Sequence, residues 1–168
     1  MFKKLLALVL LSGTFAAASV AQTVKVGVVD FTRAISETTE GQAAKTRLEA
    51  MASGKQAELE QMDASLQALA TEYQEKAPML SAEARQSFEQ RIYEGQMQLQ
   101  QAAAVADQQM QMQQVQVMDT VFNSLKGHAS AIAQAEGYTV VLEASQVIYA
   151  IDGIDLTDKV IARANGGQ

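Results

Sequence analysis

The sequence predicts an α+β protein in which a small β-rich oligomerisation body, formed by both chain ends, carries a long inserted antiparallel helical hairpin of the coiled-coil type. Segments rich in β-branched residues lie near the two ends, and Pro78 is the only proline in the helix-forming region between them. That region carries apolar residues at coiled-coil spacing. Aromatic residues make up 5% of the chain and Trp is absent, which favours an extended shape over one large globular core.

The first residues have the pattern of a cleaved secretory signal. Lys3 and Lys4 precede an apolar run and then small residues that end at Ala21, so we expect residues 1–21 to be a signal peptide. A membrane anchor is the alternative, but the apolar run is shorter than the roughly 20 residues of a spanning helix. Without the two lysines, 11 basic side chains face 19 acidic ones, a net charge of −8.

Residues 24–30 alternate and then become β-branched, which predicts a strand. A helix is expected over about 32–77, because its apolar residues recur at spacings of 3, 4, 3 and 4. These seam residues are Leu59, Met62, Leu66, Leu69 and Tyr73. Pro78 should end the helix and place a turn near 77–81.

Ser81 can cap a second helix over about 82–136. Gly137 should end it, as glycine often does just beyond a helix. We then expect strands over 138–143 and 147–151, joined by a turn at 144–146, and a short helix capped by Thr157. The predicted division is a body of residues 22–31 and 137–168, with an arm of residues 32–136.

Three short strands leave unpaired edges and an exposed apolar face, so the body is expected to be completed by other copies of the chain. The residues predicted to take part in oligomerisation lie on the expected strands. They are Val26, Val28, Val140, Leu142 and Ile148.

The residues resemble the Skp (OmpH-like) family of periplasmic chaperones across essentially the whole mature chain. "VKVGVVDFTRAI" matches the opening strand, and "GKQAELEQMDASLQALATEYQ" the ascending arm. "EGYTVVLEASQVIYAIDGIDLTDKVI", the closing hairpin and helix, is the most specific segment.

The resemblance implies a homotrimer with helical arms around a central cavity, located in the periplasm. It also implies a holdase that binds unfolded outer-membrane β-barrel proteins without nucleotide and prevents their aggregation. The best-known family members are strongly basic, which suits contact with anionic lipid and with acidic client surfaces. The acidic charge of this chain disfavours binding to anionic lipid.

The segment "QLQQAAAVADQQMQMQQVQV" suits such a role because methionine adapts to irregular partners. The expected client-binding residues lie at the turn and along the second helix. They are Met79, Leu80, Met97, Leu99, Val105, Met110 and Met112. The alternative is that the methionines are ordinary seam residues between the two helices.

The sequence predicts no enzyme, no cofactor and no metal site. Asp30, Asp152, Asp155 and Asp158 lack the ladder of a calcium loop and are explained by turns and capping. His128 lies on an apolar helix face, and cysteine is absent, which excludes disulfides and thiol chemistry. An acidic chain without a basic stripe also argues against nucleic-acid binding.

A second function remains open at this point. The hairpin could belong to a structural or adaptor protein of the cell envelope that docks one fixed partner. A docking hairpin of that kind should have a specific apolar or charged tip, and "KAPMLSAEAR" is a modest one.

Overall fold

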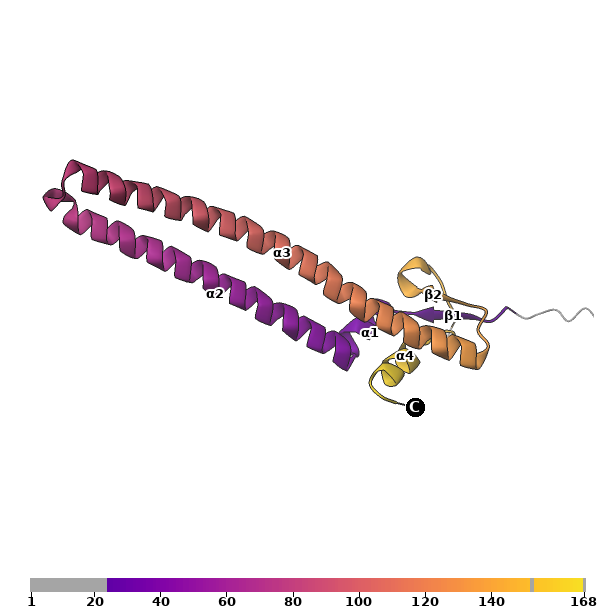
Figure 1. Cartoon of the computed structure of the whole chain (residues 1–168). Coiled ribbons are helices and arrows are strands. Elements are labelled where there is room, and N and C mark those ends of the chain that lie inside the picture. The colour runs from indigo at the N-terminus through magenta and orange to yellow at the C-terminus, as the bar shows by residue number, and fades with distance from the viewer. Residues whose placement is uncertain (1–23, 152, 168) are drawn as a thin grey trace, which may run out of the picture.

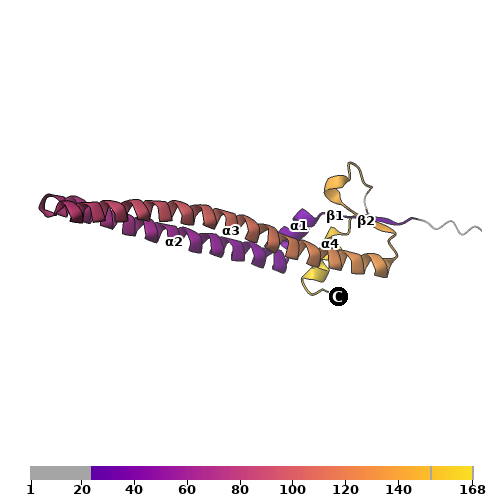
Figure 2. The ribbon, with the colours of Figure 1, turned by 45° about the horizontal axis from the view of Figure 1, so that its top comes forward.

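The computed structural model describes residues 24–151 and 153–167. The predicted signal peptide and Asp152 lie outside the described residues. The chain forms a long two-helix arm that projects from a small body at its base (Figure 1). The two arm helices run alongside one another in both views, and the turn between them lies at the far end (Figure 2).

The arm consists of α2 (Thr39–Lys76) and α3 (Ala82–Glu136). At 1.5 Å per residue they extend about 55 Å and about 80 Å. The predicted break is confirmed, because Pro78 lies in a single 3₁₀ turn, η1 (Ala77–Met79). The predicted caps of α3 are also confirmed: the Ser81 hydroxyl accepts from the Ala84 N–H, and Gly137 is left-handed with φ 70°. Among the described helices, none is both long and apolar enough to span a membrane.

The predicted continuous helix over 32–77 is wrong at one place. A short helix, α1 (Phe31–Glu37), ends at Thr38, which is extended, and α2 starts in a new direction. The buried Thr38 hydroxyl accepts from the Gly41 N–H. The Asn165 amide oxygen accepts from the Thr39 N–H at 2.8 Å. The bend therefore depends on a hydrogen-bonded threonine and on a residue 126 positions away, which a periodicity analysis does not detect.

The body is less β-rich than the sequence predicts. Over the described residues it contains two strands, β1 (Val26–Val29) and β2 (Val140–Glu143), which pair in parallel with Val26 opposite Val140. Parallel strands need a long crossover, and here the whole arm is that crossover. The outward path through α2 and the return through α3 bring β2 back beside β1 in the same direction (Figure 1).

The predicted third strand over 147–151 is also wrong in the single chain. A 3₁₀ turn, η2 (Ala144–Gln146), directs the chain away from β2. The free edge of β1 instead pairs with residues further along, because the Val28 N–H donates to the Ile154 carbonyl and the Leu156 N–H donates to the Val28 carbonyl, each at 2.8 Å. A parallel bridge at Asp155 results. Both edges of β1 are therefore occupied by the chain itself.

The final helix, α4 (Thr157–Ala164), corrects the predicted role of Thr157. No side-chain cap comes from Thr157, which is the first helical residue and is completely buried. Its hydroxyl accepts from the Asp30 N–H at 2.9 Å and donates to the Asp155 carboxylate. Asp155 also accepts from the Thr157 N–H at 2.8 Å. The hydroxyl thus fixes the start of α4 against the end of β1.

The hydrophobic core lies where the arm meets the body. It combines side chains from β1, α1, the first turns of α2, the second half of α3 and α4. Its fully buried members include Val29, Ala34, Leu125, Leu156 and Val160. Phe31 and Phe122 pack with their ring centroids 4.8 Å apart. One end of α3 is thus buried on several sides, as its wide apolar face predicts.

Two glycines of α2 give a matched test of the bend. A Cβ at Gly41 would lie 1.7 Å from the Ile35 carbonyl oxygen, whereas a Cβ at Gly54 would have nothing within 4 Å. Gly41→Ala should lower the free energy of unfolding by about 3 kcal/mol or more, since backbone must move. Gly54→Ala should raise it by about 0.5–1 kcal/mol. Urea unfolding followed by circular dichroism, at one protein concentration, measures both, and equal effects would contradict this account of the bend.

Asp155 gives a pH-dependent test of the body. Its hydrogen bond from Thr157 lowers the pKa of its carboxyl group. A lowered folded-state pKa stabilises the protein above the unfolded pKa of about 4, and that stability is lost as the pH falls through the folded value. Asp155→Asn should therefore be less stable than the unmodified protein at pH 7, with the difference shrinking toward pH 3. Asp107→Asn, on the exposed arm, is the control, and a difference that grew in acid would contradict the assignment.

Candidate functional site

The arm has one buried stripe, where α2 and α3 face one another. The predicted seam of α2 is half-buried against α3, while Ala44 and Ala106 are buried. The facing residues of α3 are Phe88, Ile92, Leu99, Ala106 and Met110. The arm is therefore thin, and most of its surface lies outside any core.

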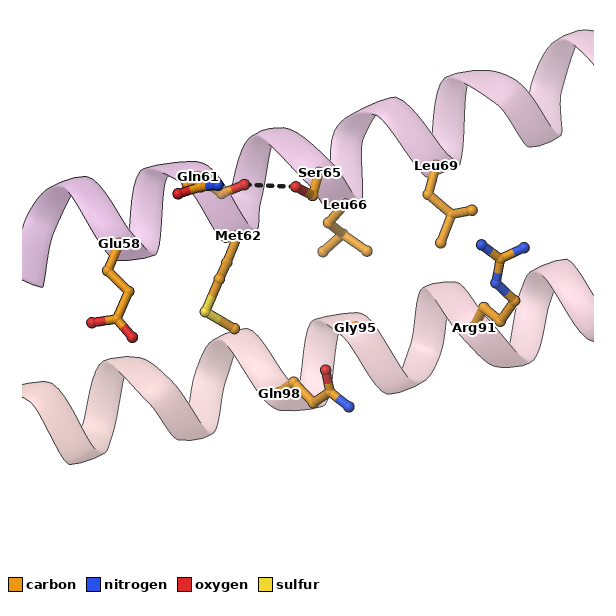
Figure 3. Close-up of a pocket in the computed structure, with 9 residues that line it drawn as sticks. All are labelled: Glu58, Gln61, Met62, Ser65, Leu66, Leu69, Arg91, Gly95 and Gln98. Atoms are coloured by element: carbon orange, nitrogen blue, oxygen red, sulfur yellow. Dashed lines mark hydrogen bonds between the residues drawn. The ribbon is translucent and has the colours of Figure 1, made fainter.

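A groove of about 460 Å³ lies between the helices midway along the arm. Leu66 and Leu69 point from α2 toward α3, where Gly95 offers no side chain (Figure 3). A Cβ at Gly95 would lie 2.9 Å from Leu66 Cδ1, so the glycine lets the helices approach here. Polar groups border the groove, with Glu58 at one end and Arg91 at the other (Figure 3).

Near the tip, the two helices are held by aromatic and polar contacts. The rings of Tyr73 and Phe88 stack with centroids 5.7 Å apart. The Tyr73 hydroxyl donates to the Glu89 carboxylate, and this bond raises the pKa of the phenol. Beyond them Met79 is highly exposed and Leu80 is half-buried. The predicted tip residues thus differ in accessibility.

The outer face of α3 carries a row of exposed apolar side chains, which we call the outer stripe. Its members are Tyr93, Met97, Val105, Met112 and Val115. At 3.6 residues per turn these positions fall within an arc of about 120°, centred about 180° from the seam residues of the same helix. α2 therefore leaves the outer stripe largely exposed, and the body does not cover it either, because it packs against the other end of α3 (Figure 1).

The structure separates the predicted client-binding residues into two groups. Met97, Val105 and Met112 are on the outer stripe, whereas Leu99 and Met110 are half-buried on the side that faces α2. Met110 lines a second interhelical groove with Met51 and Gly54, and Met112, at the edge of the outer stripe, lines the same groove. The residues predicted from the sequence do not include Tyr93 and Val115, although helical spacing from Met97 and Met112 could have identified them.

Charge is nearly absent from the same part of α3. From Gly95 to Met118, Asp107 is the single charged residue, and Gln fills all the remaining polar positions. The ion pairs of the arm include Lys55–Glu58 and Lys76–Glu72, which both lie on α2. The middle of α3 is thus a weakly apolar, uncharged helix surface, which favours adaptable contacts over recognition of one partner charge.

The body has a second exposed apolar surface, around β2 and the segment after it. Val140 and Leu142 are partly exposed, and Ile148 is fully exposed. Tyr149 and Ile151 are exposed as well, although they are not among the oligomerisation residues predicted from the sequence. A groove of about 360 Å³ runs beside β2 and includes Phe31, Phe122 and Val141 in its wall.

The other two predicted oligomerisation residues are less accessible. Val28 is only 6% exposed because it packs inside its own chain, and Val26 is half-buried. β1 thus contributes to the interior of the body, whereas the accessible apolar groups come from β2 and residues 148–151.

The acidic residues near α4 are used within the fold. The Asp30 carboxylate caps α1 by accepting from the Arg33 N–H at 2.9 Å, and Asp158 pairs with the Arg33 guanidinium. Hydrogen bonds to Glu37 and Asp158 raise the pKa of Arg33. Lys159 bonds to Glu136 and lowers the pKa of that carboxyl group. Over the described residues, no three His, Asp or Glu side chains come together as a metal site would need.

A family comparison matches most of the chain. Residues 25–163 fit the family described as "Outer membrane protein (OmpH-like)". The chain belongs to the OmpH-like family. The matched range runs from β1 through the arm to α4, so it includes both the arm and the body of this OmpH-like chain.

Relatives and a solved structure agree with that assignment. The chain is 25% identical over 146 residues to the chaperone protein Skp of Pectobacterium atrosepticum, covering 87% of this chain and 88% of the relative. It is 24% identical over 159 residues to Skp of Yersinia enterocolitica, covering 95% and 97%. A crystal structure from Caulobacter crescentus, described as a candidate OmpH-like outer membrane chaperone, matches with a TM-score of 0.79 at 20% identity and 85% coverage of each chain.

Proposed function

We propose that this OmpH-like chain is a periplasmic, nucleotide-independent holdase that binds unfolded outer-membrane β-barrel proteins and prevents their aggregation before membrane assembly. The observation that carries the proposal is the outer stripe on α3, an apolar and almost uncharged surface that the chain itself leaves uncovered. Two relatives named as Skp chaperones support the class of function.

The composition of the outer stripe suits clients without a fixed shape. An unfolded β-barrel protein offers scattered apolar side chains and unpaired backbone groups. Met97 and Met112 have flexible, polarizable side chains that can adapt to many apolar partners. Glutamines on either side, such as Gln111 and Gln116, can exchange hydrogen bonds with client backbone. Affinity would then be the sum of many weak contacts along the arm.

The same proposal assigns the exposed apolar surface of the body to self-association. We infer a homotrimer in which Val140, Leu142 and Ile148 contact neighbouring copies, with Tyr149 and Ile151 beside them. A lone segment as apolar and exposed as residues 148–151 is unfavourable in water. The parallel pair of β1 and β2 also leaves the outer edge of β2 available for backbone pairing with another chain.

The primary test is the mass of the mature protein, alone and mixed with an outer-membrane β-barrel protein diluted from urea. A trimer that takes up the client without nucleotide and keeps it soluble is the expected result. A protein that leaves this client to aggregate but binds one folded envelope protein would refute the holdase and favour the adaptor function.

Matched methionine substitutions locate the client surface. Met97→Gln with Met112→Gln should weaken client binding about tenfold, because two apolar contacts of the outer stripe are lost. The midpoint temperature of thermal unfolding should change little, since substitutions at exposed positions usually have small effects on stability. Met62→Gln, in the seam, should do the reverse: a lower midpoint with client affinity unchanged. Fluorescence titration and circular dichroism distinguish the two patterns, and equal client affinity in all three proteins would show that the outer stripe is not the client surface.

A second pair of substitutions tests the body. Ile148→Asp should convert the trimer to monomers at micromolar concentration, since burying an unpaired carboxylate in an interface is costly. Met79→Asp introduces the same charge at an exposed apolar position of the tip and should leave the trimer intact. Analytical ultracentrifugation measures both. A trimer that tolerated Ile148→Asp would place the interface elsewhere.

A further inference from the structure

Methionine supplies all the sulfur in this chain, because cysteine is absent. The described methionines differ sharply in accessibility. Met79, Met97 and Met112 are 82%, 49% and 56% exposed. The others are half-buried, either in the arm seam or against the core of the body: Met51, Met62, Met110 and Met118.

We propose that Met97 and Met112 are sulfoxidation sites through which peroxide-type oxidants weaken client holding. The inference rests on the proposed function, because both thioethers belong to the outer stripe assigned there to client binding. Exposure of the sulfur to solvent is what makes a methionine susceptible, and the conversion can be reversed by methionine sulfoxide reductases.

The chemistry is a two-electron oxygen transfer. A lone pair on the thioether sulfur attacks one oxygen of hydrogen peroxide, and an S–O bond forms as the O–O bond breaks. Proton transfer to the departing oxygen releases water. The sulfur is oxidised by two electrons and the peroxide is reduced by two. The product is methionine sulfoxide, with no other group of the chain consumed.

Oxidation would change the surface without changing the fold. A sulfoxide is polar and accepts hydrogen bonds strongly, so it prefers water to an apolar client side chain. Met97 and Met112 are about half exposed and lie outside the seam, so neither sulfoxide would have to be buried there. Tyr93, Val105 and Val115 stay apolar. Binding should therefore weaken rather than disappear, with about a tenfold rise in Kd.

The accessibility order predicts the order of reaction. Met79, Met97 and Met112 should be oxidised first by dilute hydrogen peroxide, and the four half-buried methionines later. Peptide mass spectrometry at timed intervals measures each site. Faster oxidation of Met62 or Met110 than of Met97 and Met112 would overturn the proposal, because the seam would then be the reactive part.

Leucine substitutions test the functional consequence. Leucine keeps the apolar volume of methionine, is not oxidised, and is tolerated in helices. Whatever affinity Met97→Leu with Met112→Leu has for an unfolded outer-membrane β-barrel protein before treatment, the double variant should keep that affinity after peroxide treatment. Met79→Leu, the matched control at the tip, should remain as sensitive as the unmodified protein. Treatment of the oxidised protein with a methionine sulfoxide reductase should restore binding.

The failures of the two proposals are distinguishable. If the untreated protein does not hold the client, the proposed function fails. If it holds the client and its Kd is unchanged by complete oxidation of Met97 and Met112, the sulfoxidation proposal alone fails. If the double leucine variant loses affinity as much as the unmodified protein on oxidation, other methionines are responsible and the assignment is overturned.

Discussion

Two packed helices can bury only the facing stripe of each, and this limit governs the rest of the molecule. The arm places its seam of Leu59, Leu66 and Leu69 against α3 and leaves the opposite side of α3 in water. A globular protein would cover such a surface with a third layer. Here the outer side of α3 bears Met97, Met112 and Val115 instead, so the shape of the arm itself keeps an apolar surface available.

The body holds together the ends of the two long helices that lie at the base of the arm. β1 is its centre, because β2 pairs with one edge and the chain around Asp155 with the other. Side chains from both ends of the chain then close the core around Val29, Leu125 and Val160. Buried hydroxyls of Thr38 and Thr157 fix the directions in which α2 and α4 leave it. A rigid base of this kind lets the arm extend without a core of its own.

Charge distribution connects these two parts to function. Charged side chains are concentrated outside the middle of α3, where between Gly95 and Met118 the single one is Asp107. Flexible thioethers and glutamines in this part of α3 can make adaptable contacts. These contacts do not require a particular charge on the partner. The same thioethers are open to oxidation, since Met79, Met97 and Met112 are the most exposed methionines of the described arm.

The sequence by itself determined the hairpin, because heptad spacing, Pro78, Ser81 and Gly137 are local signals that act within a few residues. Periodicity also marked which residues of α2 face the seam. Only the tertiary structure decided the bend at Thr38, the chain segments that pair with β1 and the partial burial of Met110 beside the exposed Met97 and Met112, since each depends on contacts between distant residues. The helical pattern of a sequence shows which residues are apolar. Whether another part of the protein covers such a residue is decided by packing.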